Sequence, residues 1–222
     1  MRLRTIALPA LLLMGCICTW QSNAQPFASE IKAFKKNDSL KMPPKNRILF
    51  VGSSSFTKWT DVQQYFTRQT IINRGFGGSS LPDLIYYTPD VIYPYKPKQI
   101  VVYCGENDMT GKNVTADTVL NRFKKLHGLI RAKYPKVALL YVSIKPSPSR
   151  RRLMGEIVIA NARIREFLSH DKHAVFVNVY DAMLQPNGQP DGSLFTSDSL
   201  HMNASGYALW KKLMDPYVLR SK

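Results

Sequence analysis

Residues 48–52 read Ile48-Leu49-Phe50-Val51-Gly52, an apolar run that ends in glycine and is followed by three serines. Polar and apolar residues do not alternate in this run, which is typical of a strand buried on both faces of a parallel sheet. Four more runs of the same kind follow along the chain. The predicted strands are Arg47–Val51, Thr70–Asn73, Gln99–Cys104, Val137–Ser143 and Ala174–Val179.

Helical periodicity fills the segments between these strands. The apolar stripes join Val119, Phe123, Leu126 and Ile130; Ile157, Asn161, Ile164 and Leu168; and Tyr207, Trp210, Met214 and Tyr217. Pro135 should stop the first of these helices, because proline cannot continue a helical hydrogen-bond ladder. Strands that alternate with helices predict βαβ units and one α/β domain, a three-layer α/β/α sandwich around a five-stranded parallel sheet.

The N-terminus has the features of an export signal. Two arginines precede an apolar run from Thr5 to Cys18, and small residues follow at positions 22 and 24, where a signal peptidase would read them. The run is shorter than the ~20 residues of a membrane span, so we expect no integral span. Residues 1–24 are predicted to be a cleaved signal peptide. Leu13-Met14-Gly15-Cys16 resembles a lipobox, so a lipoprotein anchored at Cys16 is the less favoured alternative.

The remainder of the chain divides into a leader and a domain. Residues 25–46 are polar and rich in lysine, and we expect them to pack on the outside of a domain that spans residues 47–222. After signal cleavage Cys104 is the only cysteine, so the mature chain cannot form an internal disulfide. Cys104 ends an apolar run and is predicted to be an inert, buried thiol.

The chain is strongly basic, with a net charge of +16. The excess lies in Lys32–Arg47, in Arg150-Arg151-Arg152 and near the C-terminus. Such charge could attract nucleic acid, an anionic membrane surface or acidic glycans. No nucleic-acid-binding motif accompanies it, and exported proteins rarely meet nucleic acid. We interpret the charge as a solvated surface, with attraction to an anionic envelope or polysaccharide as the less favoured alternative, and expect no nucleic-acid partner.

Two motifs follow the first two predicted strands. In Gly52-Ser53-Ser54-Ser55, a glycine at the strand end permits a sharp turn that lifts a hydroxyl above the sheet edge, although a serine-rich helix cap would look the same. In Asn73-Arg74-Gly75-Phe76-Gly77-Gly78, the glycines let backbone N–H groups approach a ligand closely, although a plain turn has the same composition. Ligands of such sheets bind beyond the carboxyl ends of the strands.

The other two motifs supply a neutral donor and a base. Asn107, in Gly105-Glu106-Asn107-Asp108, can donate its amide N–H to an oxyanion. Asp108 is expected to cap a following turn, and Glu106 to face solvent or lie behind the site. Asp198 and His201 are three residues apart just before the last helix, so the carboxylate can orient the imidazole toward a serine. Alternatively, Asp198 begins a helix and His201 is a surface histidine.

Metal and cofactor chemistry lack support in the sequence. No cluster has metal-ligand spacing, since His127 lies in a helical pattern and His170 and His173 lie in a charged linker. The glycine motif does not match a dinucleotide fingerprint. We expect neither a metal nor a cofactor.

Taken in order, the four motifs resemble those of the SGNH (GDSL-type) hydrolases. Gly52-Ser53-Ser54 is similar to the first block of that family, Gly77 to the second, Asn107 to the third, and Asp198 with His201 to the last. The resemblance implies a flavodoxin-like fold and ester hydrolysis without a cofactor. It implies that Ser54 is the nucleophile, and that the N–H groups of Ser54 and Gly77 and the amide of Asn107 form an oxyanion hole. One departure is Ser53, where many members carry Asp, and it bears on the subgroup more than on activity.

The predicted function is an exported serine esterase that removes short acyl groups, with acetyl esters of carbohydrate as the expected substrate. No long apolar lid lies between the motifs, which favours short acyl chains. Aromatic residues could line a sugar groove, although core packing is expected for most of them: Trp59, Tyr86, Tyr87, Tyr93 and Tyr95. The alternatives are a lysophospholipase or thioesterase, and a non-catalytic glycan-binding protein on a hydrolase fold.

Overall fold

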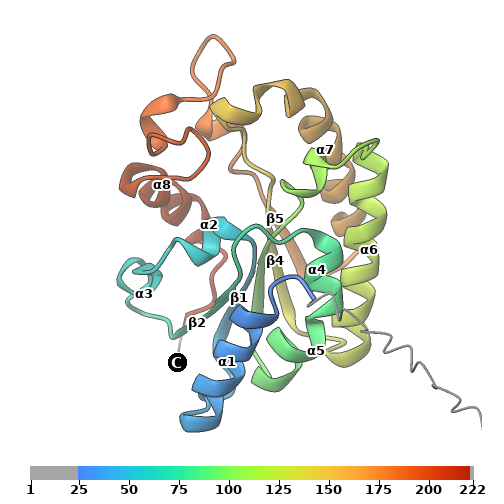
Figure 1. Ribbon diagram of the computed structural model, residues 1–222, viewed down its shortest axis with the longest axis vertical. Coiled ribbons are helices and arrows are strands. Elements are labelled where there is room, and N and C mark those ends of the chain that lie inside the picture. The colour runs from blue at the N-terminus through green and yellow to red at the C-terminus, as the bar shows by residue number, and fades with distance from the viewer. Residues whose placement is uncertain (1–24, 221–222) are drawn as a thin grey trace, which may run out of the picture.

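The structure is a computed structural model that describes residues 25–220, and the predicted signal peptide and the lipobox cysteine lie outside this range (Figure 1). Five parallel strands form one sheet in the order β2-β1-β3-β4-β5. The strands are β1 (Ile48–Gly52), β2 (Ile71–Gly75), β3 (Gln99–Tyr103), β4 (Ala138–Val142) and β5 (Ala174–Val177). The predicted α/β fold with a flavodoxin-like sheet is confirmed.

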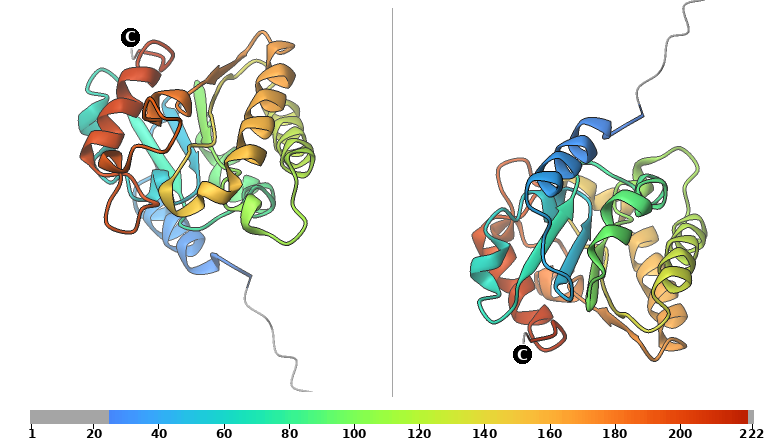
Figure 2. Two further views of the ribbon diagram at one scale, coloured as in Figure 1. Left: turned by 90° about the horizontal axis from the view of Figure 1, so that it is seen from above. Right: turned by 90° about the horizontal axis from the view of Figure 1, so that it is seen from below.

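Helices cover both faces of the sheet, as the end-on views show (Figure 2). The α-helices are α1 (Ala28–Leu40), α2 (Ser54–Thr57), α3 (Val62–Tyr65), α4 (Leu81–Tyr86), α5 (Thr88–Val91), α6 (Ala116–Lys133), α7 (Met154–Ser169) and α8 (Ala204–Met214). The 3-10 helices are η1 (Tyr93–Tyr95), η2 (Asp108–Thr110), η3 (Pro148–Leu153), η4 (Asp181–Met183) and η5 (Gly192–Leu194).

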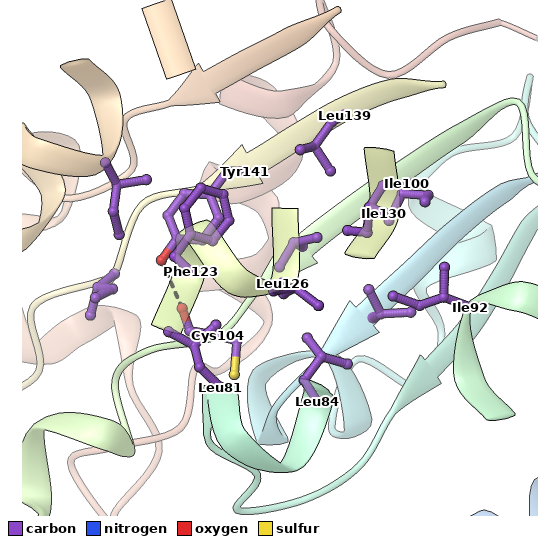
Figure 3. Close-up of a cluster of buried hydrophobic side chains, with 14 of the residues drawn as sticks. Leu81, Leu84, Ile92, Ile100, Cys104, Phe123, Leu126, Ile130, Leu139 and Tyr141 are labelled. Carbon is purple, nitrogen blue, oxygen red and sulfur yellow. Dashed lines mark hydrogen bonds between the residues drawn. The ribbon is translucent and has the colours of Figure 1, made fainter. Parts of the chain in front are cut away.

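Alternate side chains of each central strand point into two separate hydrophobic cores, one on each face of the sheet. Ile48 and Phe50 of β1 join the core formed with α2, α3 and α8, where Trp210 is fully buried. Leu49 and Val51 join the core formed with α4, α6 and α7. Figure 3 shows part of this second core. Each fully buried large apolar side chain stabilises the fold by about 1.5–3 kcal/mol, so these two cores hold the layers together.

Tyr141 and Cys104 lie together in the second core. The Tyr141 hydroxyl donates a hydrogen bond to the Cys104 carbonyl oxygen at 2.7 Å, drawn as a dashed line in Figure 3. The Cys104 thiol is buried and free, and burial raises its pKa well above the ordinary value. The prediction of a buried thiol is therefore confirmed.

The predicted apolar stripe of the last helix includes Tyr217, which the structure places outside the helix. Helix α8 ends at Met214, and Tyr217 lies beyond it with 47% of its surface exposed. Pro216 has no N–H with which to continue the ladder, so the chain turns and buries Val218 instead.

Helix α1, from the leader, runs along the outside of the domain beside α5 (Figure 1). Ile31 is its buried residue, Lys35 pairs with Asp90 at 3.0 Å, and Asp38 pairs with Arg74 of β2. Within residues 25–220, no helix combines the length and apolar character that a membrane crossing requires.

Candidate active site

The site lies at the carboxyl edge of the sheet, where the exits of β1 and β3 meet. Gly52 has φ +138°, and a Cβ there would lie 1.9 Å from the Tyr103 carbonyl oxygen, so only glycine fits. The Ser53 N–H donates to that same oxygen at 3.0 Å. This close approach sets the start of α2 directly beside the chain leaving β3. The strand order changes direction between these two strands, which is where flavodoxin-like sheets place ligands.

Only one of the three serines has an accessible side chain directed at a base. Ser53 and Ser55 are 2% and 1% exposed, whereas Ser54 is partly exposed at the first position of α2. The Ser54 Oγ lies 3.0 Å from His201 Nε2. His201 Nδ1 in turn lies 2.6 Å from Asp198 Oδ2. The structure thus brings together the three residues that the sequence singled out.

Asp198 is held by its own loop rather than by a helix. Its second oxygen accepts hydrogen bonds from the Thr196 hydroxyl and from the N–H groups of Leu200 and His201 at 2.8–2.9 Å. The His201 side chain, its backbone N–H and these other donors hold the pKa of Asp198 well below its usual range. Asp198 is therefore ionised in the folded protein at neutral pH, and its carboxylate can orient the His201 imidazole.

Asn203, which the sequence analysis did not single out, begins α8. Its side chain accepts the Gly206 N–H at 3.1 Å and donates to the carbonyl oxygens of Ser193 and Phe195. Asparagine is a preferred N-cap residue, and its position before Ala204 could have revealed the role. Because Asn203 caps α8, the alternative interpretation, in which Asp198 is the residue that begins the helix, is wrong.

At the carboxyl edge of the sheet, the N–H groups of Ser54 and Gly77 and one of the two N–H bonds of the Asn107 amide have no recorded acceptor within residues 25–220. Ser54 is the first residue of α2, where an N–H has no intrahelical acceptor. Asn107 Nδ2 donates one N–H to the Ser79 carbonyl oxygen at 3.0 Å, and no second acceptor is recorded for it in the same range. Such donors can hold an oxyanion.

Of the two acids that flank Asn107, Glu106 takes the second of its two expected positions, behind the site, and Asp108 differs from expectation. Glu106 is 4% exposed, and it accepts hydrogen bonds from the Tyr103 hydroxyl and from Lys145 Nζ, so it does not face solvent. Asp108 is also buried. It accepts the Leu81 N–H at 2.8 Å and pairs with Arg122 at 2.8 Å, so it caps α4 across space rather than its own turn. Short-range sequence reading cannot anticipate either partner.

The remaining predictions concern aromatic residues and metals. Trp59, Tyr87 and Tyr95 are buried in the cores, as expected for most of this group, and Tyr86 is exposed but lines a hollow against α1 together with Tyr87. Because they are buried, Trp59, Tyr87 and Tyr95 cannot line an open sugar groove. In the part of the chain that the structure describes, no group of three His, Cys, Asp or Glu side chains is arranged to hold a metal ion.

The profile of the GDSL-like lipase/acylhydrolase family matches residues 50–209, and the chain belongs to this family. No curated protein matches the sequence.

Solved structures with the same fold include three informative neighbours. A Streptococcus pneumonia protein provisionally described as a platelet activating factor is 25% identical, with a TM-score of 0.76 over 86% of this chain and 92% of its own. A GDSL-like lipase from Bacteroides thetaiotaomicron is 21% identical, with a TM-score of 0.73 over 85% and 96%. A carbohydrate esterase family 3 protein from Talaromyces cellulolyticus is 14% identical, with a TM-score of 0.60 over 77% and 95%.

Proposed function

We propose that this family member is a serine esterase in which Ser54 is the nucleophile and His201, oriented by Asp198, is the base. The observation that carries the proposal is the continuous hydrogen-bonded series from Asp198 Oδ2 to His201 Nδ1 at 2.6 Å and from His201 Nε2 to Ser54 Oγ at 3.0 Å. With Nδ1–H held by the carboxylate, Nε2 carries the lone pair that accepts the serine proton.

The reaction then proceeds in two acyl-transfer steps. Ser54 Oγ attacks the ester carbonyl carbon while His201 takes the hydroxyl proton, and the N–H groups of Ser54 and Gly77 with the Asn107 amide stabilise the oxyanion. The tetrahedral intermediate collapses, His201 protonates the leaving alcohol, and an acyl-enzyme remains on Ser54. Water, deprotonated by His201, repeats the sequence and releases the acid. The chain's own groups suffice for every step, without a cofactor.

We further propose that the substrate is a short acyl ester, with acetyl as the acyl group, on a carbohydrate. The Asp198 side chain is 45% exposed, which places the triad at an open surface that a bulky alcohol can approach. The basic character of the chain, whose net charge is +16 with the proposed signal peptide included, favours acidic glycans over neutral ones. The carbohydrate esterase among the neighbours illustrates only that the fold can host this chemistry. The predicted signal peptide at residues 1–24 supports export to the compartment where such polymers occur.

Two other functions remain as alternatives. A lysophospholipase or thioesterase would use the same triad, and the basic surface would suit an anionic lipid interface. A glycan-binding protein without activity fits less well, because proteins that lose catalysis normally lose one of the catalytic side chains. Here Ser54, Asn107, Asp198 and His201 are all present, and each makes a hydrogen bond to another residue of the site or its surroundings.

The test is a panel of chromogenic esters of increasing acyl length, run beside acetate release from O-acetylated xylan, pectin and sialic acid, with the Ser54→Ala protein as blank. We expect kcat/KM to be highest for acetyl or propionyl esters and to fall as the chain lengthens. A maximum of kcat/KM at an acyl chain of eight carbons or more would favour a lysophospholipase or thioesterase. Binding of the polysaccharides with no turnover of any ester would favour the glycan-binding reading.

A further inference from the structure

Arg150 is the member of the Arg150-Arg151-Arg152 run that turns toward the proposed site. Arg151 and Arg152 are exposed, whereas the Arg150 side chain is 16% exposed. Its Nη1 donates to the Glu106 carbonyl oxygen at 2.8 Å, and its Nη2 donates to Asn107 Oδ1 at 2.9 Å. One planar guanidinium therefore holds both the backbone of Glu106 and the side chain of Asn107.

The orientation of the Asn107 amide matters because its two ends have opposite chemistry. Nδ2 can donate to an oxyanion, whereas Oδ1 would repel it, although the two ends have nearly the same shape. Arg150 has only donors, so it selects Oδ1 as its partner. The Ser79 carbonyl is only an acceptor, so it selects Nδ2. Together they fix the amide so that its second N–H remains available for the oxyanion.

Arg150 itself packs against a buried ion pair between Glu106 and Lys145. Glu106 and Lys145 are 2.5 Å apart, and Arg150 Nε lies 3.9 Å from the same carboxylate. Burial by itself would raise the pKa of Glu106, but Lys145 and Arg150 lower it, so the carboxylate is charged. The guanidinium cannot swing away without leaving this buried carboxylate with one cation fewer.

The short helix that carries Arg150 also contacts the other half of the site. In η3, which follows β4 after a five-residue connection, the Ser149 N–H donates to the Ser199 carbonyl oxygen at 3.0 Å. Ser199 lies between Asp198 and His201 in the loop that carries the base. Thus η3 connects the loop of the base with the asparagine of the oxyanion hole, and Arg150 makes the second of these two connections.

We propose that Arg150 is a positioning residue for catalysis, acting through Asn107 to keep the amide N–H directed at the oxyanion. This inference rests on the proposed esterase function. Since the oxyanion contact forms only in the transition state, loss of Arg150 should lower kcat and leave KM nearly unchanged.

The experiment compares Arg150→Gln with Arg151→Gln, a matched change of the exposed neighbour, on a short acyl ester. We expect Arg150→Gln to lower kcat about 10–100-fold, less than or equal to the loss from removing an oxyanion donor outright, with KM within about 2-fold. Arg151→Gln should behave as the wild type. In an Asn107→Ala background, Arg150→Gln should lower kcat by no more than about 2-fold further, because its route of action is gone.

Arg150→Lys covers the case in which Arg150→Gln fails to fold. It keeps a positive charge beside Glu106, but one ammonium cannot reproduce the paired contacts to Glu106 and Asn107, so most of the loss in kcat should persist. The proposal is overturned if Arg150→Lys restores wild-type kcat, or if the Arg150 effect is as large with Asn107→Ala as without it. Failure of the esterase proposal looks different, because then Ser54→Ala would have the same activity as the wild type.

Discussion

Residues 25–220 contain two Asp–His pairs with similar geometry and different surroundings. Asp198 and His201 lie 2.6 Å apart at the carboxyl edge of the sheet, and Asp171 and His127 lie 2.8 Å apart near the start of β5, at the opposite edge. The histidine side chains are 16% and 14% exposed. A carboxylate beside an imidazole is therefore common to an active-site candidate and to a structural contact.

The partners of each pair account for the difference. The second nitrogen of His201 faces the Ser54 hydroxyl at 3.0 Å, so a proton can move from an oxygen to the ring. In the part of the chain described, His127 has no hydrogen bond to a serine or cysteine side chain. Asp171 instead accepts from Arg131 at 2.7 Å and from the His173 N–H at 2.9 Å. That pair ties α6 to the connection before β5, and we assign it to stability.

The largest expected effect is on the nucleophile. Ser54→Ala should lower kcat at least about 10³-fold, because only the oxyanion hole and substrate binding remain. Ser53→Ala and Ser55→Ala remove buried hydroxyls next to it and serve as controls that should keep substantial activity. Steady-state kinetics on an acetyl ester measure this. If Ser55→Ala is the inactive variant, the nucleophile has been assigned one position too early.

The next effect compares the two carboxylates by activity. Asp198→Asn should lower kcat about 10²-fold with little change in KM, since the amide cannot stabilise the imidazolium and favours the wrong tautomer. The exposed Asp198 is partly screened by water, which places the loss at the lower end of the range for such residues. Asp171→Asn should leave kcat unchanged. Equal losses in the two variants would remove the functional distinction between the pairs.

The comparison reverses when stability is measured. Burial would raise the pKa of Asp171, but the hydrogen bond from His127, the His173 N–H and Arg131 lower it to about 2. Asp171→Asn should therefore lower the free energy of unfolding at pH 7 by about 1–2 kcal/mol.

The same contact predicts how the destabilisation depends on pH. The folded-state pKa of Asp171 is below the unfolded value of ~3.9, so its contribution is complete above pH ~4 and disappears as the pH falls toward about 2. The difference in urea unfolding free energy between wild type and Asp171→Asn should shrink over that window. A difference that is constant from pH 7 to pH 2 would show that the ionised carboxylate is not responsible.

The sequence predicted the sheet and the Asp198–His201–Ser54 arrangement because both depend on local patterns. Continuous apolar runs mark the strands, and residues at the carboxyl ends of neighbouring parallel strands must meet. The register within the serine run came from a family resemblance, and the structure gives it a physical basis, since Ser53 and Ser55 are buried.

What the sequence did not yield were contacts between distant polar residues. Arg150, Arg151 and Arg152 are chemically identical in sequence, and only the path of η3 after β4 turns Arg150 inward. The sequence left Glu106 either facing solvent or behind the site, and it could not decide between the two because its cation, Lys145, lies beyond the end of another strand. The basic character that was interpreted as a solvated surface therefore includes two cations that pack behind the site.

The most direct test of the assignment is the rate at which a fluorophosphonate labels the protein, with the modified residue identified by mass spectrometry. Such a reagent reacts with a serine only when a base activates it. The wild type and His127→Ala should be labelled at Ser54 at similar rates, whereas His201→Ala should be labelled more slowly by about 10²-fold or more. Labelling of another serine, or equal rates for His201→Ala and His127→Ala, would contradict the account.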